Sequence, residues 1–244
     1  MNSTGKQFIN RTKYSDLGPS DQHLGKPQPP LQLDFDKTQL VIKLPKPREI
    51  ITEFADVRKT IEQRKSIRNY SEAPLTIDQL SYLLWCTQGV KEVFRGTATM
   101  RNVPSAGARH ALETYLLINN VEGITPGLYR FLALEHTLIS VSLEVDIADK
   151  ITQACLKQQM IKSCAVTFLW TAVAYRMNWR YGERGYRYLY LDAGHVCQNL
   201  YISAESIKCG TCAIAAYSDD ELNQVLGLDG KEQFVIYLAT VGLK

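Results

Sequence analysis

The chain has 244 residues, of which 45% are hydrophobic and 22% charged, and its formal net charge is +3 at pH 7. This composition is ordinary for a soluble globular protein, the charge is too small to indicate a nucleic-acid or membrane partner, and the longest apolar run, residues 165–175, is too short to cross a bilayer. The polar N-terminus has no signal-peptide pattern, so the six cysteines predict free thiols in a cytoplasmic protein and no disulfide framework.

Residues 1–48 are set apart by their proline content, because six of the nine prolines of the chain fall there. Proline excludes long helices and central strands, so we expect either a disordered leader or an extended arm that lies on the folded body. Leu31, Leu33 and Phe35 alternate with polar residues, which favours docking of part of this segment. We therefore divide the chain into a proline-rich N-terminal arm, 1–48, and a regular domain, 49–244.

From residue 49 onward, apolar spacing predicts a regular series of elements. Two of their starts are marked by capping boxes, at Thr76–Gln79 and at Ser218–Glu221. The predicted elements are, in chain order, helix 50–61, helix 77–88, strand 114–119, strand 127–132, amphipathic helix 146–163, strand 166–175 buried on both faces, helix 184–207, helix 219–226 and buried strand 234–241. Helices and strands are interleaved, which predicts an α+β layered architecture.

A basic cluster follows the first predicted helix. Arg64, Lys65, Ser66 and Arg68 place three cations and a hydroxyl within five residues. A dianionic phosphate is bound by fixed charge, hydroxyl donors and backbone N–H groups, so the cluster is a candidate phosphate site. A solvated helix end remains the alternative, since the helix dipole favours cations at a C-terminus.

Two further segments attract attention by composition. Pro104, Ser105, Ala106, Gly107 and Ala108 form a small-residue loop, which allows a flat ligand to approach the backbone. An ordinary loop that enters the next strand has the same composition. Residues 175–190 interleave arginines with aromatic side chains, a pattern that also occurs in single-strand nucleic-acid binding, although the net charge of +3 argues against such a partner.

The remaining polar motifs predict structural roles. His195 lies in the middle of the long predicted helix, where a hydrogen-bonded structural histidine is expected. Cys209 and Cys212 form a C-x-x-C without a second pair or a histidine pair, so we expect buried inert thiols and no metal site.

The order and spacing of 64–68, 104–108, 182–188 and 193–195 resemble the flavin-binding nitroreductase family and, within it, the azoline-oxidising (SagB-type) dehydrogenase branch. The resemblance covers about residues 49–244, and 44–47 resembles the end of the branch's proline-rich arm. It implies a nitroreductase-like α+β fold with a central, mostly antiparallel sheet flanked by helices. It also implies an intertwined homodimer with two FMN molecules at the interface.

The resemblance also implies the cofactor-binding residues. The phosphate and ribityl chain of FMN would lie on Arg64, Ser66 and Arg68, with Lys65 in the family's variable place. Residues 104–108 match the loop that packs against the flavin ring, usually in the partner subunit's site. Residues 214–217 match the segment that approaches the flavin N5 edge, so the backbone at Ala215 and Ala216 would polarise N5 and O4.

One departure concerns catalysis. Azoline oxidases carry a Lys-Tyr pair credited with base catalysis, and the matching positions here are Arg180 and Tyr181. Arginine keeps its proton at any working pH and is a poor base, which weakens azole formation as the specific reaction, whereas Tyr181 can still donate a proton.

The function that the resemblance implies is an FMN-dependent oxidoreductase that moves hydride through flavin N5. Its partners would be a small-molecule or peptide substrate and NAD(P)H, with no nucleic acid and no membrane. The alternatives are a flavin-binding protein without turnover and an azoline-to-azole oxidase of a peptide-modifying cluster.

Overall fold

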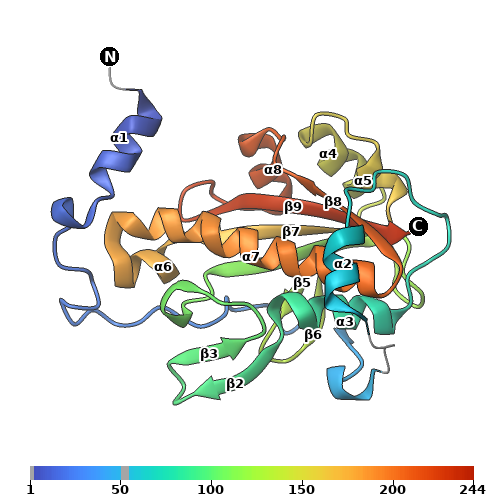
Figure 1. Cartoon of the computed structure of the whole chain (residues 1–244), viewed down its shortest axis with the longest axis horizontal. Coiled ribbons are helices and arrows are strands. Elements are labelled where there is room, and N and C mark those ends of the chain that lie inside the picture. Colours follow the sequence, from blue (N-terminus) through green and yellow to red (C-terminus); the bar gives the residue numbers. More distant parts are fainter. Residues whose placement is uncertain (1–2, 51–54) are drawn as a thin grey trace.

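A central sheet organises the chain, and the computed structural model describes residues 3–50 and 55–244 around it (Figure 1). The strands of the sheet are β1 (Val41–Lys43), β4 (Leu112–Ile118), β5 (Gly127–Leu132), β6 (Thr137–Ser142), β7 (Val166–Val173), β8 (Cys209–Ile214) and β9 (Gln233–Leu243). These form a seven-stranded sheet in the order β1-β6-β5-β4-β7-β9-β8, and every pairing in it is antiparallel. A separate hairpin joins β2 (Val90–Phe94) to β3 (Ala98–Arg101).

Helices cover both faces of the sheet. One face carries α3 (Ile77–Gln88), α6 (Ala174–Tyr181) and α7 (Gly185–Ser206), and the other carries α4 (Ile147–Ala154), α5 (Met160–Ser163) and α8 (Asp219–Leu226). The longest helix, α7, runs along its face of the sheet, as Figure 1 shows. Two shorter helices, α1 (Thr4–Arg11) and α2 (Val57–Gln63), lie outside these layers.

Strand alternation explains the two cores. On β4, Leu116 and Ile118 belong to the core under α3 and α7, whereas Tyr115 and Leu117 belong to the core under α4, α5 and α8. Successive side chains of a strand point to opposite faces, so a central strand covered on both sides is apolar throughout. The predicted α+β fold with a helix-flanked antiparallel sheet is therefore confirmed.

Local signals predict several elements correctly. Thr76 and Gln79 form the reciprocal capping box at the start of α3, and Gly89 ends that helix. The long helix, the two strands before residue 133 and the last strand lie within a few residues of their predicted bounds.

Three predictions are corrected. The helix over 146–163 is two helices, because Leu156 and Lys157 between them have positive φ. The Ser218 side chain makes no capping hydrogen bond, although α8 begins there. The predicted strand 166–175 ends at Val173, where α6 begins.

The first predicted helix also begins later than expected. The helix there, α2, starts after its N-cap Asp56, and the Asp56 side chain accepts a hydrogen bond from the Lys59 amide. The predicted start falls partly on residues 51–54, which lie outside the described residues.

The arm, taken as the described residues 3–48, lies along the body. Trp179 Nε1 donates to the Lys26 carbonyl at 2.9 Å, and the Leu33 amide donates to Glu113 Oε1 at 3.0 Å. Farther along, β1 pairs with β6 at the edge of the sheet, and Leu44 is buried in the core. The arm thus adds a strand and apolar contacts to the fold.

Glu113, which accepts the hydrogen bond from Leu33 of the arm, also forms a buried ion pair with Arg176 of α6. Its Oε1 lies 2.7 Å from Arg176 Nη2, and the two side chains are 5% and 3% exposed. We expect Glu113→Ala to lower the free energy of unfolding by roughly 3–5 kcal/mol, because Arg176 then stays buried without a counter-ion. Urea denaturation measures this. Asp149→Asn, which breaks the exposed pair with Lys162, is the control and should have a much smaller effect; equal effects contradict the assignment.

Candidate functional site

The basic cluster lies against the free edge of the sheet. The Ile67 amide donates to the Thr211 carbonyl of β8 at 3.0 Å, and Ser66 forms a parallel bridge with Thr211. Gly210 permits this approach, because a Cβ there would stand 2.7 Å from the Ile67 Cβ. Backbone pairing with the sheet thus fixes the position of the cluster.

Tyr201 of α7 joins the cluster to β8. The Ala213 amide donates to Tyr201 Oη at 2.8 Å, and Tyr201 Oη lies 3.0 Å from Ser66 Oγ, where either hydroxyl can be the donor. The Arg64 guanidinium carbon lies 4.9 Å from the centre of the Tyr201 ring, within cation–π range. Tyr201 was not predicted from the sequence, since nothing local distinguishes it from other helix tyrosines.

The cations of this cluster are not neutralised by any described acidic side chain. Among the described residues, Arg64, Lys65 and Arg68 take part in no ion pair, and Lys65, Ser66 and Arg68 are exposed. A dianionic phosphate would find three positive side chains and a hydroxyl here. The structure therefore places these residues in an arrangement that fits a phosphate group.

A buried carboxylate shapes the loop at 104–108. Asp192 of α7 accepts from Ser105 Oγ at 2.5 Å and from the Ala106 amide at 3.3 Å. Burial raises the pKa of Asp192, and its bonds to Ser105 and Ala106 act in the opposite direction. Ser105 Oγ in turn accepts from the His110 amide at 2.9 Å. Asp192 is the second residue that the sequence did not indicate.

Gly107 brings this loop against the predicted catalytic pair. Its φ is +56°, and a Cβ there would stand 2.5 Å from Tyr181 Oη and 2.9 Å from Arg180 Cδ. Ala108 is also left-handed, with φ of +52°, a conformation that is uncommon without glycine and concentrates at functional sites. Two segments predicted separately, 104–108 and 180–181, therefore meet in the fold.

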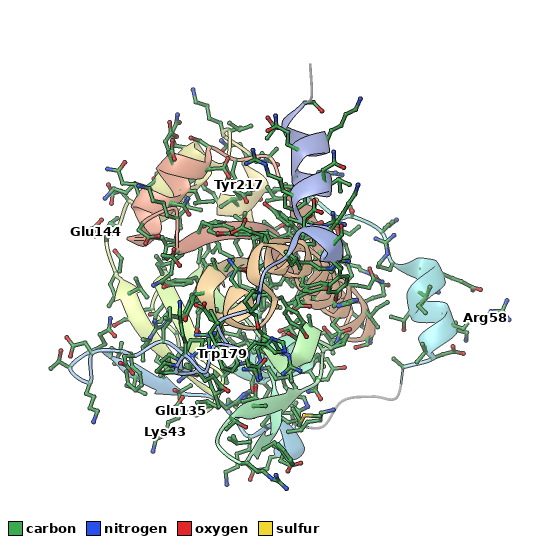
Figure 2. The ribbon with its side chains drawn as sticks, turned by 90° about the vertical axis from the view of Figure 1, so that its left-hand side faces the viewer. Lys43, Arg58, Glu135, Glu144, Trp179 and Tyr217 are labelled. Carbon is green, nitrogen blue, oxygen red and sulfur yellow. The ribbon has the colours of Figure 1, made fainter. Side chains whose placement is uncertain are left out.

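A second arginine stands beside this junction. Arg109 is buried, and its guanidinium carbon lies 5.5 Å from the centre of the Trp179 ring; Figure 2 shows Trp179 beside the ribbon of the arm. Burial lowers the pKa of Arg109, and the positive charge of Arg180 lowers it further. Positive charge thus accumulates next to the loop.

Ala215 and Ala216 follow the end of β8 and are both exposed. Within the hydrogen bonds of the described residues, neither amide N–H has a protein acceptor, while the Ala216 carbonyl accepts from Gln158 Nε2 at 2.8 Å. Two adjacent amide donors are therefore available to a ligand, as the predicted backbone contacts to a flavin require.

The predicted residues form two groups along α7. The loop 104–108 is held at Asp192 and the basic cluster at Tyr201, nine positions farther along the helix. At 1.5 Å per residue this is about 14 Å. No hydrogen bond or ion pair between described residues joins the two groups within one chain.

The exposure of the remaining polar motifs tests the roles predicted for them. His195 is exposed and forms no hydrogen bond through its side chain with another described residue, so the prediction of a hydrogen-bonded structural histidine is wrong. Cys209 and Cys212 are free and buried, and burial raises the pKa of Cys209 to about 12, which keeps that thiol protonated. In the described parts of the chain, no helix is long and apolar enough to cross a membrane, and no cluster of three or more His, Cys, Asp or Glu side chains could hold a metal.

Comparison with known proteins now identifies the family. The model of the nitroreductase family matches residues 61–243. The chain belongs to the nitroreductase family. Its family relatives include a nitroreductase-like protein of Methanocaldococcus jannaschii, 34% identical over 203 residues, which cover 83% of this chain and 96% of that protein.

A trifolitoxin-processing protein and a chain of a microcin synthetase complex also match. The trifolitoxin-processing protein of Rhizobium leguminosarum bv. trifolii is 27% identical over 154 residues, which span 62% of this chain and 41% of that longer protein. A chain of the E. coli microcin synthetase McbBCD complex, solved with truncated pro-MccB17 bound, has a TM-score of 0.61 at 17% identity. The match covers 97% of this chain and 85% of that one, and shows a shared fold.

The close approach at Gly107 gives a direct test of the site geometry. We expect Gly107→Ala to lower the free energy of unfolding by at least about 1 kcal/mol, because alanine is strained at positive φ and its methyl group meets Arg180 and Tyr181. Thermal unfolding measures this. Gly18→Ala, whose Cβ meets nothing within 4 Å, is the control and should not destabilise the protein. If both variants unfold alike, the loop does not rest on the pair.

Proposed function

We propose that this chain is an FMN-dependent oxidoreductase of the SagB-type branch, which transfers hydride between a donor and a small-molecule or peptide substrate. The observation that carries the proposal is the group of three cations around Ser66, which form no ion pair with a described residue and are held on the edge of β8 by backbone pairing and by Tyr201. FMN, when bound, supplies the redox chemistry at its ring, and the protein supplies binding and orientation.

Each candidate residue then has a definite role. Arg64, Ser66 and Arg68 hold the phosphate end, with Lys65 as an additional exposed cation. The free amides at Ala215 and Ala216, beyond the end of the same strand, donate to the polar edge of the ring. In this proposal Tyr201 positions the cluster without touching the cofactor, because its hydroxyl is already used by Ser66 and Ala213.

The two separated groups of site residues support a homodimer. The loop 104–108 of one subunit would complete the site formed by residues 64–68 and 215–216 of the other. On α7 beside Asp192, Tyr190 is 60% and Leu191 59% exposed, and Gly194 is exposed with open space beside it. Such an apolar helix face suits a second copy.

Light scattering of the flavin-loaded protein at micromolar concentration should report twice the chain mass, and a single-chain mass contradicts the dimer.

The absorption spectrum of the purified protein and the removal of the Arg68 charge test the cofactor proposal. We expect the purified protein to carry non-covalent FMN, and Arg68→Ala to weaken its affinity about ten- to hundredfold, since a charge-assisted hydrogen bond contributes roughly 1.5–3 kcal/mol. The control is Arg58→Ala: Arg58 extends from α2 away from the body (Figure 2) and pairs with Glu62. Calorimetric titration with FMN compares the three proteins.

Two results of this titration contradict the cofactor proposal. One is a colourless protein that takes up no FMN, and the other is equal loss in the two variants. A protein that binds FMN but is not reduced anaerobically by NADH or NADPH favours the alternative, a flavin-binding protein without turnover.

A second candidate reaction is the oxidation of azolines in a peptide, which the resemblance to the azoline-oxidising branch suggests and with which the match to a trifolitoxin-processing protein is compatible. Arg180 in place of lysine weighs against it, because a permanent cation cannot act as the base. We expect Tyr181→Phe to slow the chemical step more than Arg180→Ala, on the roughly 10²–10⁴-fold scale of general acid–base groups. Single-turnover kinetics with one reducible substrate measures both. Full loss in Arg180→Ala at unchanged flavin content would make the arginine essential and this assignment wrong.

A further inference from the structure

A cavity lies between the arm and the end of α6. It has a volume of about 740 Å³, within the range of small-molecule sites. Its lining is contributed by the arm and by the predicted catalytic pair: Tyr14, Leu17, Gly18, Pro19, Ser20, Gln22, His23, Arg180 and Tyr181. The arm therefore forms most of the lining opposite Arg180 and Tyr181.

Specific contacts hold this wall in place. The Arg184 guanidinium carbon lies 4.2 Å from the centre of the Tyr14 ring, and Tyr14 Oη lies 2.9 Å from Tyr188 Oη. Arg184 Nη1 also donates to the Thr12 carbonyl at 2.8 Å. Cation–π and hydrogen-bond contacts of this kind fix both the ring and the backbone.

The other end of the wall is fixed as well. The Gln22 amide donates to the Trp179 carbonyl at 2.8 Å, and Ser20 Oγ lies 2.8 Å from His23 Nδ1. The segment from Tyr14 to His23 is thus attached to α7 near its first residue and to α6 near its last residue.

Arg180 gives the lining of the cavity a positive charge. Arg180 is half-buried and makes no ion pair with any described residue, and Arg109 is its neighbour. The acidic Asp21 of the arm is already bound by Lys26 and Tyr175, each at 2.9 Å. A half-buried arginine without a counter-ion favours an anionic ligand, and a planar guanidinium suits a carboxylate.

The remaining lining favours a flat, apolar group. Tyr14 and Tyr181 contribute aromatic rings, and Leu17 and Pro19 contribute aliphatic surface. Aromatic rings pack well against such side chains.

We propose that this cavity is the substrate pocket, that the arm from Tyr14 to His23 is its wall, and that it takes a small aromatic molecule with a carboxylate that binds Arg180. Its role as the substrate pocket rests on the function proposed above; its capacity to bind an aromatic carboxylate does not. Arg180 is then a binding residue, and the arm determines which substrates reach Tyr181.

The first test compares two probes of equal shape. Calorimetry of the oxidised protein, without any electron donor, measures the binding of 4-nitrobenzoate and of neutral 4-nitrobenzamide. We expect the carboxylate to bind at least about tenfold more tightly, and Arg180→Gln to bring the two affinities together. Equal affinities in the unaltered protein overturn the choice of ligand.

The second test blocks the cavity from the arm. Gly18 lines the cavity, is exposed and has open space beside it, so Gly18→Phe should fold normally and fill part of the volume. We expect it to weaken 4-nitrobenzoate binding more than tenfold. Gly5→Phe is the matched control: Gly5 lies in α1 of the same arm, also with open space beside it, and its substitution should leave binding unchanged.

The outcomes separate this inference from the proposed function. If the protein takes up FMN and is reduced by NADH, but Gly18→Phe binds 4-nitrobenzoate as the unaltered protein does, the arm is not the wall of the pocket and the inference fails. If no FMN is bound, while 4-nitrobenzoate binding still depends on Gly18 and Arg180, the cavity stands as an anion-selective aromatic site and the redox function fails.

Discussion

The buried carboxylate of Glu113 connects the parts on which the candidate site depends. It accepts from the Leu33 amide of the arm and from Arg176 of α6, and the same arginine donates to the His110 carbonyl beyond the 104–108 loop. A charged group without water must find such partners, because an isolated buried charge costs far more than a paired one. Arm, helix and loop are therefore set against one another by the need to satisfy one side chain on the central strand β4.

The long helix α7 sets the distance between the two halves of the site. Asp192 fixes the loop that rests on Arg180 and Tyr181, and Tyr201 fixes the phosphate-type cluster. Since both residues stand on one helix that packs on the sheet, their separation is as rigid as the helix itself. In the proposed dimer, α7 therefore fixes the distance that the second copy has to bridge to complete the site.

Sequence reasoning succeeded where the signal is local and failed where it depends on distant partners. The capping box at Thr76 and the doubly buried strand β7 are encoded within a few residues. The edge strand β8 was missed because its pairing with β9 and with residue 66 is decided by tertiary contacts. Asp192 and Tyr201 have no local mark for the same reason. The candidate cofactor residues came from the resemblance, which could not indicate that Gly107 meets Tyr181 or that the arm lines a cavity.

The arginine at position 180 fits a division of labour within the pocket. A lysine there could lose its proton when half-buried and act as a base, whereas an arginine stays charged and presents a planar set of donors. Next to Arg109, whose charge burial already disfavours, a second permanent cation is unfavourable unless an anion offsets it. Among the described residues no carboxylate forms an ion pair with Arg180, and Asp21 is bound by Lys26. In the proposed pocket, proton transfer is therefore left to Tyr181, Arg180 binds negative charge, and the position that carries the base in the azoline-oxidising branch serves to select the substrate.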